Sequence, residues 1–140
     1  MEYYFDSDEF KESALYKNFI SINNSNGILK IEASTAGEAY PLKDVNITIS
    51  KMIDGNKVIF YQGNTNDSGV IESIVLPTRK VPEEVNDADD ILYTTYDLDA
   101  YYSEYDLNKK YNVSIFDNVK VIQPVIFTIS ELMEGESIGR

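Results

Sequence analysis

Hydrophobic and polar residues follow two different periods along this chain, and the period changes at Gly27. Between residues 7 and 22 the apolar residues lie near helical spacing. Ser7 or Asp8 stands at the start with acids after it, as is usual at a helix N-terminus. The apolar residues with this spacing are Phe10, Ala14, Leu15, Phe19 and Ile22. We therefore predict a short N-terminal α-helix within residues 1–23, ended by the turn-forming sequence NNSNG.

After Gly27 apolar and polar residues alternate, which is typical of strands with one buried face. The alternation is clear in ILKIEAS (28–34) and VNITIS (45–50). Asp54 and Gly55 then form a dipeptide that favours a tight hairpin turn before KVIFYQG. Further strands are predicted at VIESIVLP, YNVSIF and VKVIQPVIFTIS. The inward positions predict this core: Leu29, Ile31, Val45, Ile47, Ile49, Phe60, Ile74, Leu76, Val113, Ile115, Val125, Phe127 and Ile129.

The polar stretch 64–69 between two predicted strands has two interpretations, a phosphate-binding loop or a bend. A phosphate loop needs several glycines, usually with a lysine and a following helix. This stretch has one glycine, Gly69, no lysine, and a strand after it. Asn66, Asp67 and Ser68 have side chains that hydrogen-bond the neighbouring backbone in turns. We therefore predict a bend.

Five or six short strands after one helix predict an antiparallel β-sandwich over residues 24–140. The segment TNDSGVIESIVLP resembles the T-D-x-x-G hairpin and strand of carboxypeptidase regulatory-like, or transthyretin-like (prealbumin-like), β-sandwich domains. GILKIEAS and YPLKDVNITIS resemble the first two strands of that family, and YNVSIF resembles the strand that begins its last hairpin. The ending FDNVKVIQPVIFTI is similar to domains of clostridial spore cortex-lytic and germination proteins.

This resemblance implies a non-catalytic structural or protein-interaction module in a spore, cell-envelope or phage-associated assembly. It implies no transferable active site. The expected partner is a protein, with a glycan as the alternative.

Composition narrows the chemistry further. The formal net charge of −12 repels nucleic-acid backbones and anionic membrane surfaces, so neither is an expected partner. The chain has no histidine, which excludes Ser-His-Asp and Cys-His nucleophile systems built from this chain alone. Carboxylates, lysine, tyrosine and Ser/Thr remain as catalysts. The acidic N-terminus does not read as a signal peptide, so we expect a protein that stays inside or whose targeting segment was left off.

Residues 81–108 contain nine acids and no basic residue, and we predict a long acidic, tyrosine-rich connection at about 78–110. Calcium binding is one interpretation, because Ca²⁺ prefers several carboxylate oxygens in a flexible loop. Its candidate ligands are Asp87, Asp89, Asp90, Asp97 and Asp99. The spaced acidic pattern of a dedicated calcium loop is absent, so a solvated loop without a cofactor is the favoured interpretation.

The tyrosines of the same segment also have two interpretations. Tyrosine has a rigid apolar ring with a polar hydroxyl, which suits contact with a partner or a sugar ring. In strand-rich proteins tyrosines more often pair across strands, and we favour this packing role. The candidate partner-binding residues are Tyr96, Tyr101, Tyr102 and Tyr105.

Three functions follow in order of expectation. The first is the non-catalytic module, and the second is a carbohydrate- or calcium-binding accessory module. The third is a carboxylate-dependent hydrolase that uses Asp97 and Asp99. A small sandwich rarely has a cleft deep enough to raise the pKa of one carboxylate, so we do not expect an enzyme.

Overall fold

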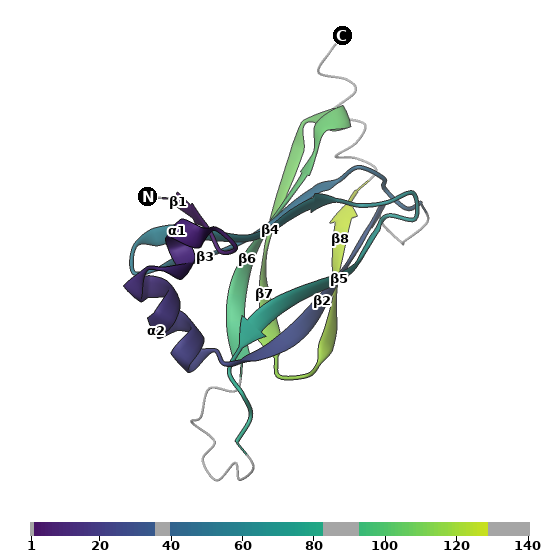
Figure 1. Cartoon of the computed structure of the whole chain (residues 1–140). Coiled ribbons are helices and arrows are strands. Elements are labelled where there is room, and N and C mark those ends of the chain that lie inside the picture. Colours follow the sequence, from purple (N-terminus) through teal and green to yellow (C-terminus); the bar gives the residue numbers. More distant parts are fainter. Residues whose placement is uncertain (1, 36–39, 83–92, 129–140) are drawn as a thin grey trace.

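The computed structural model describes residues 2–35, 40–82 and 93–128, which form two sheets and two short helices (Figure 1). The elements in chain order are β1 (Glu2–Tyr4), α1 (Asp8–Lys11), α2 (Ala14–Ile22), β2 (Ser25–Thr35), β3 (Asn46–Ile53), β4 (Asn56–Asn64), β5 (Val70–Thr78), β6 (Tyr93–Tyr102), β7 (Leu107–Phe116) and β8 (Lys120–Phe127). A single 3₁₀ turn, Ser103–Tyr105, joins β6 to β7. Neither helix in these ranges is long and apolar enough to cross a membrane.

The two sheets confirm the predicted β-sandwich. The larger has the strand order β1-β4-β3-β6-β7 and the smaller the order β5-β2-β8. Most neighbouring strands are antiparallel, but β1 runs parallel to β4 and β2 runs parallel to β8. The central strand β2 therefore joins an antiparallel neighbour on one side to a parallel neighbour on the other.

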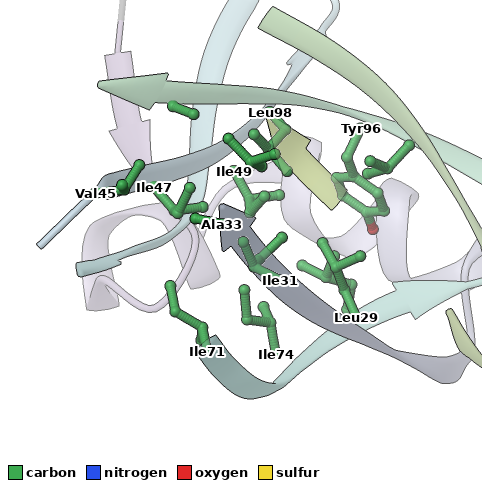
Figure 2. Close-up of a cluster of buried hydrophobic side chains, with 14 of the residues drawn as sticks. Leu29, Ile31, Ala33, Val45, Ile47, Ile49, Ile71, Ile74, Tyr96 and Leu98 are labelled. Atoms are coloured by element: carbon green, nitrogen blue, oxygen red, sulfur yellow. The ribbon is translucent and has the colours of Figure 1, made fainter. Parts of the chain in front are cut away.

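Side chains from both sheets fill the space between them (Figure 2). Most of the predicted core is confirmed as buried, because alternate residues of each strand face the opposite sheet. Phe60 differs, since it is only partly buried and packs against the edge of the core. Ile129 lies outside the described residues.

The N-terminal segment differs from the predicted single helix because a second cap divides it. The Ser7 hydroxyl accepts a hydrogen bond from Phe10 N at 3.2 Å and begins α1. The Ser13 hydroxyl accepts from Tyr16 N at 3.2 Å and begins α2. Ser13 also donates to Phe10 O at 2.5 Å, so it ends one helix and starts the next.

An aromatic cluster fixes this helical segment against the larger sheet. The ring of Phe5 stacks on Phe60 with centroids 4.5 Å apart, and Phe10 and Phe19 lie within 6.2 Å of Phe5. Phe10 is fully buried. The helices therefore cover the end of the core near β4, as Figure 1 shows on the side of the N-terminus.

The stretch 64–69 is a bend, as predicted. The Asn66 side-chain oxygen accepts hydrogen bonds from Ser68 N at 2.9 Å and Val70 N at 3.0 Å. Gly69 has a φ of 75°, a value that costs glycine little. All of these interactions stabilise the reversal between β4 and β5.

The predicted connection at 78–110 is wrong over its second half, because it contains strand β6. This strand pairs with β3 and β7 in the interior of the larger sheet. Its acids occupy outward positions: Asp97 lies opposite Asn112, and Asp99 lies opposite Lys110. The inward positions alternate with them and are buried. Residues 93–102 of the acidic segment therefore form an alternating strand with Asp97 and Asp99 on its outer face.

Candidate functional site

The neighbouring strands β3 and β6 stay paired for only part of their lengths. Their pairing runs from Asn46 opposite Tyr101 to Ser50 opposite Asp97. Beyond that point β3 stays paired with β4, and β6 stays paired with β7. We call this divergence, between residues 51–53 of β3 and 93–96 of β6, the β3–β6 split.

Lys51 places its amine in the β3–β6 split. Its Nζ donates a hydrogen bond to the backbone oxygen of Thr95 at 2.7 Å. The same nitrogen lies 5.6 Å from the centroid of the Tyr96 ring, a cation–π distance. The amine therefore contacts a carbonyl of β6 beyond the last β3–β6 pair, at the edge of the hydrophobic core.

The position of Lys51 along β3 explains why it is half-buried. Ile47 and Ile49 face the core, and two-residue alternation gives Lys51 and Ile53 the same direction. Ile53 packs against the core, as expected for this direction. A lysine therefore stands in a position of the strand where an apolar residue is the rule.

This environment changes the acid–base behaviour of the amine. Burial lowers the pKa of Lys51 below its ordinary value of 10.5, and the negative charge of Asp97 opposes part of this change. A lower pKa means a larger fraction of neutral amine near neutral pH. The neutral amine is the form that accepts a proton or attacks a carbonyl carbon.

Lys51 lines a surface pocket of about 330 Å³. The other lining residues are Asn23, Arg79, Tyr93, Thr94 and Thr95. Arg79 is exposed and follows the last residue of β5, so the pocket combines a half-buried amine with a permanently charged guanidinium. The permanent charge of Arg79 favours a ligand that carries an anionic group.

A buried polar network holds the pocket wall in place. The Thr94 hydroxyl donates to Asn23 Oδ1 at 2.5 Å, and the Asn23 amide donates to Phe19 O at 3.1 Å. The hydroxyl oxygens of Thr78 and Thr94 are 3.2 Å apart, and Thr78 donates to Ile115 O at 2.7 Å. The network joins the end of α2 to both sheets, and it thereby fixes the position of the pocket wall.

The candidate partner-binding tyrosines have different environments. Tyr96 is only 1% exposed, so it is a core residue and is not available for contact with a partner. Tyr102 is buried against Phe127, and Tyr105 packs against the edge of the core. Tyr101 is 38% exposed. Tyr96 and Tyr102 therefore pack in the core, and a partner contact at Tyr101 and Tyr105 stays a prediction.

The candidate calcium ligands are separated in a similar way. Asp87, Asp89 and Asp90 lie outside the described residues. Asp97 and Asp99 share the outer face of β6, where Lys110 contacts Asp99 at 2.5 Å. Within residues 2–35, 40–82 and 93–128 no group of three or more acidic, His or Cys side chains lies close enough to hold a metal ion. The calcium site stays a prediction.

Sequence reasoning missed both cations of the pocket. A signal for Lys51 was present, because it continues the inward-facing series of Ile47 and Ile49. No signal identified Arg79, since its place beside Lys51 depends on the packing of β5 against β6. The carboxylates, in contrast, were predicted as candidate site residues from their number in the segment alone.

Comparison with known proteins supports the architecture and identifies it as a transthyretin-like β-sandwich. One similar solved structure is the 5-hydroxyisourate hydrolase of Klebsiella pneumoniae, with 14% identity and a TM-score of 0.47 over 73% of this chain and 90% of that one. Another is an (S)-allantoin synthase, with 12% identity and a TM-score of 0.51 over 76% of this chain and 42% of that one. The chain thus spans less than half of the synthase. No family model matches the chain, and no curated protein matches its sequence.

The prediction of a non-catalytic module is contradicted by this comparison. The (S)-allantoin synthase, which shares this fold over 42% of its own length, is an enzyme. The prediction assumed that a small sandwich has no room for a site. At the β3–β6 split, where two strands diverge, side chains nevertheless line a surface depression without any deep cleft between the sheets.

Proposed function

We propose that this chain is a lysine-dependent hydrolase of small anionic carbonyl compounds, with Lys51 as general base and Arg79 as the anion-binding residue. The position of the Lys51 amine carries the proposal. It is half-buried in the β3–β6 split and lines a pocket together with a guanidinium. The absence of histidine from the chain leaves lysine as the side chain best suited to this role.

The reaction follows from these two groups. The neutral Lys51 amine takes a proton from a water molecule while the water oxygen attacks the carbonyl carbon of the substrate. The bond to the leaving group then breaks, and the Lys51 ammonium returns the proton to that group. Arg79 binds the anionic group of the substrate and orients the carbonyl toward Lys51. Thr95 O accepts a hydrogen bond from Lys51 and holds the amine in position.

Two activated esters test this proposal by the release of 4-nitrophenolate. One is the neutral 4-nitrophenyl acetate, and the other is the anionic 4-nitrophenyl hydrogen succinate. We expect the protein to hydrolyse the anionic ester faster than the neutral ester. Lys51→Arg keeps the positive charge but removes the accessible neutral amine, so it should lower kcat by about 100-fold or more. Arg79→Gln should raise KM for the anionic ester alone.

Lys17→Met is the matched control, because Lys17 is an exposed lysine on α2 far from β3 in sequence. It should leave both rates unchanged. Circular dichroism melting shows whether each variant is folded. The proposal is wrong if the wild-type protein hydrolyses neither ester faster than buffer, or if a folded Lys51→Arg variant retains the full rate.

We also propose a closer kinship within the transthyretin-like fold, with carboxypeptidase regulatory-like domains and in particular those of clostridial spore cortex-lytic and germination proteins. The hairpin motif at 65–77 and the ending at 116–129 support this kinship. It concerns descent and leaves the reaction open. An alignment of this chain with its homologues tests it. A better match of those homologues to hydroxyisourate hydrolases would contradict it.

A further inference from the structure

A second depression lies on the outer face of the larger sheet. It has a volume of about 270 Å³, and we call it the outer groove. Its lining residues are Ser50, Met52, Lys57, Asp97, Leu98, Asp99, Lys110 and Tyr111. The β3–β6 split forms this groove as well, since Met52 lies beyond the last β3–β6 pair. None of the proposed catalytic groups lines it.

The outer groove carries charges of both signs on opposite sides. Lys57 lies opposite Met52 in the β3–β4 ladder, and their side chains therefore share one face of the sheet. Asp97 lies opposite Ser50 across the β3–β6 ladder. Since β3 lies between β4 and β6 and diverges from β6 beyond Ser50, the backbones at Lys57 and Asp97 are separated by more than the ~10 Å of two regular strand spacings. The long lysine side chain bridges much of this distance.

The remaining charges of the groove compensate one another. Asp99 and Lys110 form a salt bridge at 2.5 Å across β6 and β7. Asp97 accepts a hydrogen bond from the Asn112 amide at 3.4 Å, and its charge also acts on Lys51 and Lys110, but it forms no salt bridge with any residue that the structure describes. Lys57 forms no salt bridge with any residue in the described ranges. A carboxylate and an ammonium thus lie across an open groove from each other.

Between these two charges the groove presents an apolar surface. Met52 is 57% exposed, and its flexible thioether side chain adapts to different ligand shapes. The volume of about 270 Å³ is slightly below the ~300–1,000 Å³ typical of drug-sized ligands. A small metabolite therefore fits, and a large cofactor does not.

We propose that the outer groove binds a small zwitterion of the free α-amino acid class. Asp97 binds the ammonium group, Lys57 binds the carboxylate, and Met52 contacts an apolar side chain. The net charge of the ligand is consistent with the field of the protein. The long-range field of a chain of formal charge −12 does not repel a molecule with no net charge.

Three related compounds test this site by changes in the ¹H–¹⁵N spectrum of the protein. L-methionine has both charges, N-acetyl-L-methionine has only the carboxylate, and L-methionine amide has only the ammonium group. We expect L-methionine to shift the amide signals of residues 50–52 and 97–99. The two compounds with one charge should each bind at least roughly tenfold more weakly than L-methionine, because each loses one charge-assisted hydrogen bond.

Three variants connect the binding to the groove. Asp97→Asn and Lys57→Met should each weaken L-methionine binding by roughly tenfold. Asp67→Asn, on the exposed 64–69 bend, should leave it unchanged. The proposal fails if L-methionine shifts no signal at these residues, if all three compounds bind equally, or if neither groove variant weakens binding. These binding outcomes do not decide whether Lys51 hydrolyses esters. Lys57→Met is the variant to compare in both assays, because the charge of Asp97 also acts on the pKa of Lys51.

Discussion

Replacing Tyr96 with phenylalanine removes one hydroxyl group from the centre of the sandwich and leaves the ring in place. The hydroxyl donates a hydrogen bond to Pro77 O at 2.5 Å, and both residues are buried. The ring also packs at right angles to Phe60, with centroids 4.9 Å apart. This packing survives the substitution, so the loss is confined to the hydrogen bond.

The expected cost follows from the buried acceptor. Without the Tyr96 hydroxyl, Pro77 O loses a hydrogen-bond donor at a buried residue, which costs about 1–3 kcal/mol. The matched control is Tyr101→Phe, because Tyr101 is exposed and donates to Asp106 Oδ1 at 2.8 Å. Water replaces that bond, so the control should change the free energy of unfolding by less than about 0.5 kcal/mol.

Urea denaturation followed by circular dichroism measures both variants. The free energy of unfolding comes from the midpoint, provided that the dependence on urea concentration stays the same. We expect Tyr96→Phe to have a clearly lower midpoint than Tyr101→Phe. Equal midpoints would refute the assignment of Tyr96 to the core and would make it available again as a partner-binding residue.

Three further predictions test the fold. Gly55→Ala and Gly69→Ala each place alanine at a positive φ, which costs about 1–2 kcal/mol. Only the Cβ at position 69 collides with Ala33 O, so Gly69→Ala should lower the melting temperature more than Gly55→Ala. Equal losses would contradict this packing. Phe127→Ala should cost about 3–5 kcal/mol in urea denaturation, and a cost below 1 kcal/mol would contradict its full burial. Burial and the Glu104 carboxylate raise the pKa of Tyr102 to about 12, so the folded state holds this proton more tightly than the unfolded chain. Stability should therefore fall as the pH rises above about 10, and Tyr102→Phe should reduce this loss; an unchanged pH dependence would contradict it.

Much of the fold was predictable because alternation survives in a single sequence. In ILKIEAS every second residue is apolar, and the strand turns these residues toward the core. Strand β6 has the same alternation, with Tyr96 and Leu98 inward and Asp97 and Asp99 outward. The number of acids along the segment does not reveal that Asp97 and Asp99 lie on one face of a strand. The division of the N-terminal helix at Ser13 depends on one side-chain hydrogen bond that periodicity does not reveal.

The candidate site was less predictable than the fold. Lys51 was detectable as a charged residue in an inward position, but its contact with Thr95 O requires that β3 and β6 diverge. That divergence depends on how the larger sheet pairs, which a local pattern does not contain. The outer groove has the same origin, since Lys57 and Asp97 come from strands that are distant in the sequence.

Direct measurement of the Lys51 pKa tests the account where it is most specific. Titration of the lysine side-chain signals by NMR, with Lys51→Arg to assign the Lys51 signal, gives the pKa of this amine. We predict that Lys51 loses its proton below the ordinary lysine value of 10.5, because burial disfavours its charged form. A Lys51 signal that titrates at or above 10.5 would contradict this prediction and would remove the basis for a lysine general base.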